Sequence, residues 1–312
     1  MMPTTKSVPP TLKTMRWCIA VALSYVVLIF VLPGNHATMH HYHLSAVGYR
    51  VVNVALALPT IAVWFAAFWG YAKLREYSSA IARSKEGPQF DRLANGCAWL
   101  AWSLPVTTLS AFLLNGLANK WPAFHNPAVI ISNYVALILP FIAFITISLA
   151  ARGMIGKSRL NMDLASARVL MASFLAGGLA YCFFIFRHLD LTSLSSTNNP
   201  YFLPVWLLII SVIIPYLYAW FIGLLAAYEI SLFSANVHGL LYRRALLYMV
   251  SGLVAVILSS IALQYISSVV PRNGNLVFDY KLLIILVVRI VGGVGFFVLA
   301  IGVSRLKKIE EV

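Results

Sequence analysis

The chain has 312 residues, of which 61% are hydrophobic and 10% are charged, and its formal net charge is +14. Soluble domains are about 45–50% apolar and about 25% charged, so one soluble core cannot bury this much apolar surface, whereas a bilayer can. The net charge does not indicate a nucleic-acid partner, because the basic residues lie in short gaps between long apolar stretches. In that position they act as cytoplasmic topology signals beside anionic lipid.

Eight apolar stretches are long enough to cross a bilayer, which needs about 20 helical residues. Each should be helical, because lipid offers no hydrogen-bond partner to free backbone groups. The sequence therefore predicts an all-α, polytopic integral membrane protein with about eight transmembrane helices. The expected spans are 16–33, 48–72, 94–118, 128–151, 167–187, 202–229, 244–270 and 281–303.

Positive charge is concentrated in every second gap between these spans. One side holds Lys6, Lys13, Arg16, Lys73, Arg75, Arg83, Lys85, Arg92, Arg152, Lys157, Arg159, Arg168, Arg243, Arg244, Arg305, Lys307 and Lys308. The other side holds only Arg50, Lys120, Arg187, Arg272 and Lys281. Because cytoplasmic loops carry the excess of lysine and arginine, the split predicts a multi-pass protein of the cell membrane with both termini in the cytoplasm.

An internal duplication is expected from two matching segments. Pro59-x4-Trp64-Phe65 in the second span recurs as Pro215-x4-Trp220-Phe221 in the sixth. A four-helix unit is even, so both copies would have the same orientation, which makes a 4+4 parallel repeat. The expected organisation is a cytoplasmic tail (1–15), a first repeat (16–152), a linker (153–166), a second repeat (167–304) and a cytoplasmic tail (305–312).

The longest expected cytoplasmic loop runs from residue 73 to residue 92. Leu74, Tyr77 and Ile81 recur in it at helical spacing. The pattern predicts that the second span continues as a helix that lies on the lipid surface and ends near Gly87-Pro88.

Four histidines gather in the first outer loop, at His36, His40, His41 and His43. Imidazole is a good ligand for zinc, copper or nickel. A helical loop would bring His36, His40 and His43 to one face, whereas an extended one would align His41 with His43. The alternative is a solvated polar loop that at most gains charge at acidic pH. The only cofactor that the sequence suggests is thus a transition metal at this loop.

A second outer-face cluster, Arg187-His188-x-Asp190, closes the fifth span. Asp190 could orient the imidazole of His188, as carboxylates do in catalytic and metal sites. No nucleophile or second acid is tied to the pair by sequence spacing, and an ordinary interfacial charge cluster is the alternative.

Arg289 is the ionisable residue that lies clearly within a span. A charge at this depth costs several kcal/mol unless it is paired or hydrated, so it marks a candidate anion contact, lipid-headgroup contact or gate. Asp279 and Asp190 are possible partners. The alternative is that the side chain extends along the helix to the outer interface.

Three further residues complete the predicted transport path or gate. Pro59 and Pro215 occupy matching positions and should kink their helices, and paired breaks in corresponding spans point to a central site. Glu229 should lie at the cytoplasmic interface, within reach of Arg243 or Arg244. The prolines can equally serve packing alone.

Three functions remain open from the sequence. The first is a transporter or channel-like protein for a small solute or lipid. The second is an outer-face metal- or haem-dependent redox or sensor protein, and the third is a non-catalytic scaffold or complex subunit. Expected partners are the bilayer, a small solute and membrane subunits or a second copy. Because nucleotide-binding and common hydrolase motifs are missing from the sequence, nothing in it assigns an enzymatic activity.

Overall fold

The computed structural model describes residues 10–31, 45–120, 125–155, 164–187, 213–236, 240–269 and 280–310. These residues are helical, with a short turn at 81–86 and no strand among them. The helices are α1 (Pro10–Val31), α3 (Ala46–Ala80), α4 (Gly87–Lys120), α5 (His125–Ile155), α6 (Leu164–Arg187), α8 (Ile214–Asn236), α9 (Leu240–Val269) and α10 (Tyr280–Glu310).

Seven of the described helices are long and apolar enough to cross a membrane: α1, α3, α4, α5, α8, α9 and α10. The remaining helix, α6, has 24 residues, and its apolar stretch Arg168–Ala180 is shorter. Apolar side chains face outward along the bundle; Leu23 of α1 and Val294 of α10 are 61% and 55% exposed. Such a surface suits lipid and not water, so the expected multi-pass helical architecture is confirmed.

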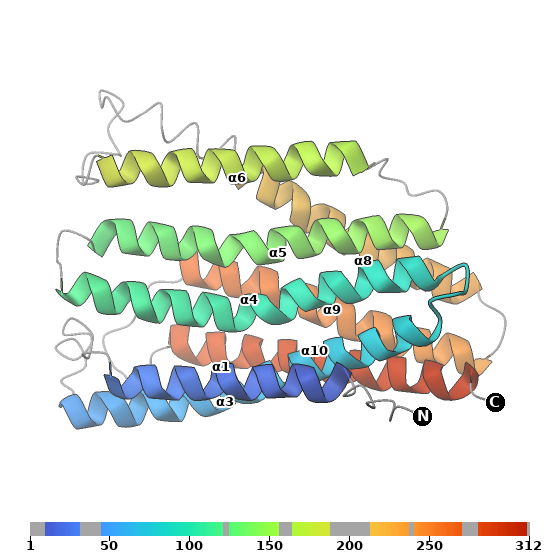
Figure 1. Cartoon of the computed structure of the whole chain (residues 1–312), viewed down its shortest axis with the longest axis horizontal. Helices are drawn as coiled ribbons and strands as arrows, with labels where there is room; N and C mark the ends of the chain where they lie inside the picture. The colour runs from blue at the N-terminus through green and yellow to red at the C-terminus, as the bar shows by residue number, and fades with distance from the viewer. Residues whose placement is uncertain are drawn as a thin grey trace, which may run out of the picture.

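Six helices form a closed ring of neighbours. α3 packs on α4, α4 on α5, α5 on α8, α8 on α9, α9 on α10, and α10 packs again on α3. α1 lies outside the ring against α3, and α6 lies outside it against α5 and α8 (Figure 1). Aromatic side chains such as Trp64, Phe68 and Phe144 fill the interior and are at most 1% exposed.

The helices run past the expected spans at one end of the bundle. α3 continues to Ala80 instead of residue 72, α4 begins at Gly87 instead of 94, and α8 continues to Asn236 instead of 229. The chain enters α1 and leaves α10 at this same end (Figure 1). Hydropathy ends a span at the first charges, whereas the helix continues wherever neighbouring helices cover its apolar side.

The second span continues as a helix into the first long loop, as expected, but it ends at Ala80 and not near Gly87-Pro88, and the prediction that it lies on the lipid surface is wrong. Leu74 and Tyr77 are fully buried, and the Tyr77 ring meets that of Phe90 edge-on, with 5.1 Å between ring centroids. The apolar residues do recur at helical spacing, but their side chains pack against α4 and not against lipid. α3 and α4 therefore form a continuous hairpin that projects beyond the apolar spans. Residues 156–163, within the expected linker, lie outside the described part of the chain.

Glycines set the position of α10 between its two neighbours. A methyl group on Gly252 of α9 would lie 2.5 Å from the carbonyl oxygen of Gly295 in α10. A methyl group on Gly70 of α3 would lie 2.7 Å from the carbonyl oxygen of Phe296 in α10. Backbones this close leave no room for a side chain, as is common between membrane helices. α10 is thus fixed against both α9 and α3.

Candidate functional site

Arg289 enters the bundle from α10. It lies roughly 14 Å along the axis from the start of the helix, at about 1.5 Å per residue. Its Nη1 donates a 3.0 Å hydrogen bond to Oγ1 of Thr60 on α3, and Thr60 is only 3% exposed. The positive charge is therefore directed at a buried hydroxyl on a neighbouring helix.

The bond runs sideways between helices and not toward either end of the bundle. α3 and α10 run in the same direction, since Gly293 approaches Val63 and Phe296 approaches Gly70 further along both helices. Arg289 and Thr60 precede these contacts on their helices and lie at a common level. A snorkelling arginine would extend its side chain along the helix to reach the interface, and the observed direction differs from that.

Tyr25 of α1 interacts electrostatically with Arg289 and is 7% exposed. Its ring lies 5.4 Å from that of Trp64 on α3 and 5.9 Å from that of Phe112 on α4, centroid to centroid. Tyr25 therefore connects Arg289 to an aromatic cluster built from α1, α3 and α4.

A second buried hydroxyl lies one turn further along α10. A methyl group on Gly292 would lie 2.6 Å from Oγ of Ser259 on α9. Ser259 is 6% exposed, and its hydroxyl donates to the carbonyl of Val256 at 2.9 Å. We call Tyr25, Thr60, Ser259 and Arg289 the Arg289 site; its residues come from α1, α3, α9 and α10.

Carboxylates that the structure describes do not neutralise Arg289. Glu76 pairs with Lys73 at 3.0 Å, and Asp91 pairs with Arg75. None of the described acidic side chains forms an ion pair with Arg289. Asp190 and Asp279, which the sequence offered as partners, lie outside the described residues.

Pro59 belongs to this site through its neighbour Thr60. It lies inside α3, where a proline removes a backbone donor and frees the carbonyl one turn earlier. Pro215 is buried in the first turn of the described part of α8, where proline is well tolerated. Pro59 therefore directly precedes the hydrogen-bond partner of Arg289 on α3, whereas Pro215 lies on α8, which packs on α5 and α9.

Glu229 lies within the packed part of α8 and is 4% exposed. α8 continues beyond it to Asn236, and Arg243 and Arg244 of α9 are exposed. Glu229 interacts with neighbouring residues and is not a free carboxylate. The sequence placed it at the end of a span, whereas it is a buried residue near the basic end of the bundle.

Most residues of the two predicted outer-face clusters lie outside the described part of the chain. His36, His40, His41, His43, His188 and Asp190 are not described, and Arg187 is described only as the last residue of α6. Among the residues that were searched, no three histidine, cysteine or acidic side chains gather in a possible metal site. Metal binding at the histidine loop therefore stays a prediction.

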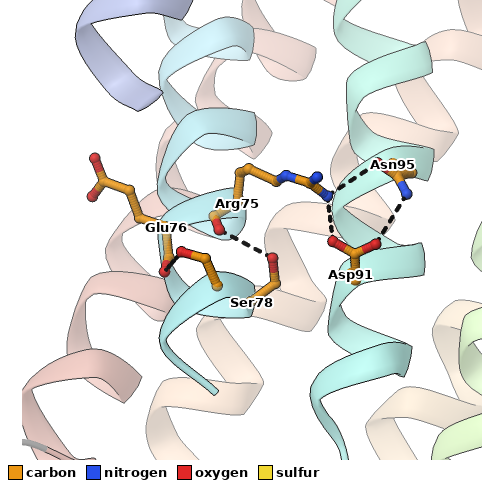
Figure 2. Close-up of polar contacts among 6 residues, drawn as sticks. Arg75, Glu76, Ser78, Asp91 and Asn95 are labelled. Carbon is orange, nitrogen blue, oxygen red and sulfur yellow. Dashed lines mark hydrogen bonds and ion pairs between the residues drawn. The ribbon is translucent and has the colours of Figure 1, made fainter. Parts of the chain in front are cut away.

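A polar cluster that the sequence did not predict joins α3 to α4. Arg75 donates to the carboxylate of Asp91 and, at 3.3 Å, to Oδ1 of Asn95 (Figure 2). The Arg75 and Asp91 side chains are 40% and 48% exposed, so solvent screens the pair and it contributes at most about 1 kcal/mol. The signal in the sequence was Asp91 and Asn95 at i, i+4 spacing. The cluster aligns the hairpin and offers no buried chemistry.

The chain matches no protein-family model, no curated protein and no solved structure with which it was compared. Its function must therefore be argued from its own residues.

A double-mutant cycle tests the Arg289–Thr60 contact. Thr60→Val keeps the side-chain shape and removes the acceptor, and Arg289→Met removes the donor. We expect a coupling energy of about 0.5–2 kcal/mol, the range of interhelical hydrogen bonds in membranes. The measurement is reversible unfolding in mixed micelles.

Thr108→Val is the matched control for this cycle, because the Thr108 hydroxyl donates within its own helix to Leu104 at 2.9 Å. Its effect should add to that of Arg289→Met without coupling. Equal, near-zero coupling for Thr60 and Thr108 would contradict the assigned contact.

Proposed function

We propose that this chain is a transporter or channel-like protein that moves a small solute or lipid along the contact between its two halves. The observation that carries the proposal is the hydrogen bond from Arg289 to buried Thr60. Ionisable residues inside membrane spans are expensive and mark pathways, relays or sensors. Here the charge also contacts the residue that follows Pro59, a proline that removes a backbone hydrogen bond from α3.

The proposed path depends on a division of the bundle into α1, α3, α4 and α5 and their counterparts α6, α8, α9 and α10. Exchange of the two sets maps the α3–α4 contact onto α8–α9, α4–α5 onto α9–α10, and α10–α3 onto α5–α8. α1 against α3 corresponds likewise to α6 against α8. This pattern supports the parallel 4+4 duplication, with α6 as the eighth helix, and α3–α10 and α5–α8 are the two corresponding boundaries between halves. The contact of α5 with α6 also joins the halves.

A boundary between two similar halves suits alternating access. In many transporters one repeat rocks against the other around a site near the midplane. Arg289 and Thr60 belong to opposite halves, so movement of the halves would break or remake their bond. Pro215 and Glu229 lie on α8, at the other boundary, and are proposed to respond to the same movement.

We propose that the basic end of the bundle faces the cytoplasm and that the host membrane is the cell membrane. Exposed Arg83 and Lys85 lie in the α3–α4 turn, and Arg243, Arg244 and Arg305 are exposed near helix ends on the same side. The positive-inside rule orients such a bundle with both termini in the cytoplasm.

Cysteine labelling tests this orientation. In a variant with Cys18, Cys97 and Cys182 replaced by alanine, single cysteines are introduced at exposed Ser84 and exposed Ala46, near opposite ends of α3. A membrane-impermeant maleimide should label Ala46→Cys in intact cells and Ser84→Cys only after permeabilisation. The reverse pattern would overturn the proposed orientation.

Flux measurements test the proposed function. The full chain is reconstituted in vesicles that report movement of small anions, cations, neutral solutes and fluorescent phospholipid. At least one flux should exceed that of protein-free vesicles, and Arg289→Met should reduce it about tenfold or more, as loss of one charged contact can. Arg243→Met, an exposed arginine near the end of α9, should leave it unchanged. A background flux for all four probes, or a flux indifferent to Arg289→Met, would contradict transport through this site.

A further inference from the structure

Arg289 carries a permanent charge that the described residues do not balance. A guanidinium has five N–H donors and stays protonated at all accessible pH values. The described residues supply it with one hydrogen-bond acceptor, the neutral hydroxyl of Thr60. A hydroxyl dipole is a weak substitute for a counter-charge in a medium with little water. Among the described residues the remaining donors have no acceptor, while Asp190 and Asp279 lie outside that part of the chain.

The Arg289 side chain has a fixed orientation but is not completely buried. The bond to Thr60 fixes one edge of the guanidinium, while Arg289 as a whole is partly exposed. Ile290 and Val291 are 46% and 47% exposed, but at 3.6 residues per turn they lie on other sides of α10 than Arg289. Access of a ligand to the guanidinium therefore depends on the partial exposure of Arg289 itself.

The geometry of a guanidinium selects the ligand chemistry. Its planar fork matches the paired oxygens of phosphate and carboxylate, to which it forms two parallel hydrogen bonds. Tyr25, which interacts electrostatically with Arg289, packs against Trp64 and Phe112. An oxyanion at Arg289 would therefore have apolar aromatic side chains in its neighbourhood.

We infer that Arg289 binds an oxyanion, either the phosphate or carboxylate of a lipid or a free small oxyanion of the same chemistry. The inference rests on the proposed function and narrows its substrate to this class. Thr60 is a positioning residue, since it holds the guanidinium through a hydrogen bond and has no assigned contact with the ligand. A purely structural clamp between α3 and α10 is the competing account.

The test compares three probes on the full chain purified in detergent: inorganic phosphate, phosphatidylglycerol and phosphatidylcholine. Binding is measured by titration calorimetry for phosphate and by native mass spectrometry for the lipids. The wild type should bind phosphate or phosphatidylglycerol more tightly than phosphatidylcholine. Preference for the lipid alone identifies a headgroup site, and binding of both probes identifies a site open to free oxyanions.

Three variants assign the binding to Arg289. Arg289→Met should weaken it about tenfold or more, and Arg289→Lys, which keeps the charge but loses the fork, should weaken it by a similar or smaller factor. Arg243→Met should bind like the wild type, because Arg243 is exposed near the end of α9. If Arg289→Met does not fold, Arg289→Lys decides, and wild-type binding in that variant would overturn the bidentate site.

The failures of the two proposals are distinguishable. Flux without anion binding at Arg289 would overturn the oxyanion inference and leave transport standing. Anion binding without flux would do the opposite. Equal affinity of the wild type and both Arg289 variants for all three probes would leave Arg289 as a clamp.

Discussion

The close approach of α10 to α9 and α3 is the constraint on which the rest of the structure depends. At Gly252 and Gly70, the backbones of α9 and α3 lie so close to α10 that a methyl group would not fit between them. Without a hydrophobic drive between helices in lipid, such close packing is what holds them together. It fixes the level of α10 against α3, and that level decides where Arg289 points. At this level the Arg289 side chain donates its hydrogen bond to Thr60 of α3.

Most of the architecture could be predicted because hydropathy and charge act over whole helices. On the side away from the basic loops, the expected spans agree with the described helices to within a few residues, as for 48–72 and α3. The sixth span is the exception, because its residues 202–212 lie outside the described part of the chain and α8 begins at Ile214. The packing of the helix extensions at the basic end could not be predicted, since Leu74 and Tyr77 have the same spacing whether they face lipid or α4. Only the packing of Tyr77 on Phe90 decides between the two. The order of neighbours around the ring is also a tertiary property that no single span contains.

The candidate site was predicted in part. Arg289 and Pro59 stood out because a charge and a proline are costly inside a membrane helix. Their link could not be predicted, because Thr60 is an ordinary threonine until α10 is placed beside α3. Grouping Pro215 and Glu229 with Arg289 followed from sequence symmetry, whereas in space both lie on α8 beside α5 and α9. The histidine loop remains a sequence prediction, since it lies outside the described residues.

The most direct test of the central packing is a disulfide between α3 and α10 at the level of the Arg289 site. A Cβ atom on Gly293 would lie 3.6 Å from Cβ of Val63, within the range of about 3.5–4.5 Å for disulfides. With the native cysteines replaced, Val63→Cys/Gly293→Cys should oxidise readily, as detected by mass spectrometry of the linked peptides. Val63→Cys/Val287→Cys is the control, because Val287 is 51% exposed, and it should stay reduced. Failure of the first pair to form, or equal oxidation of both pairs, would contradict the account.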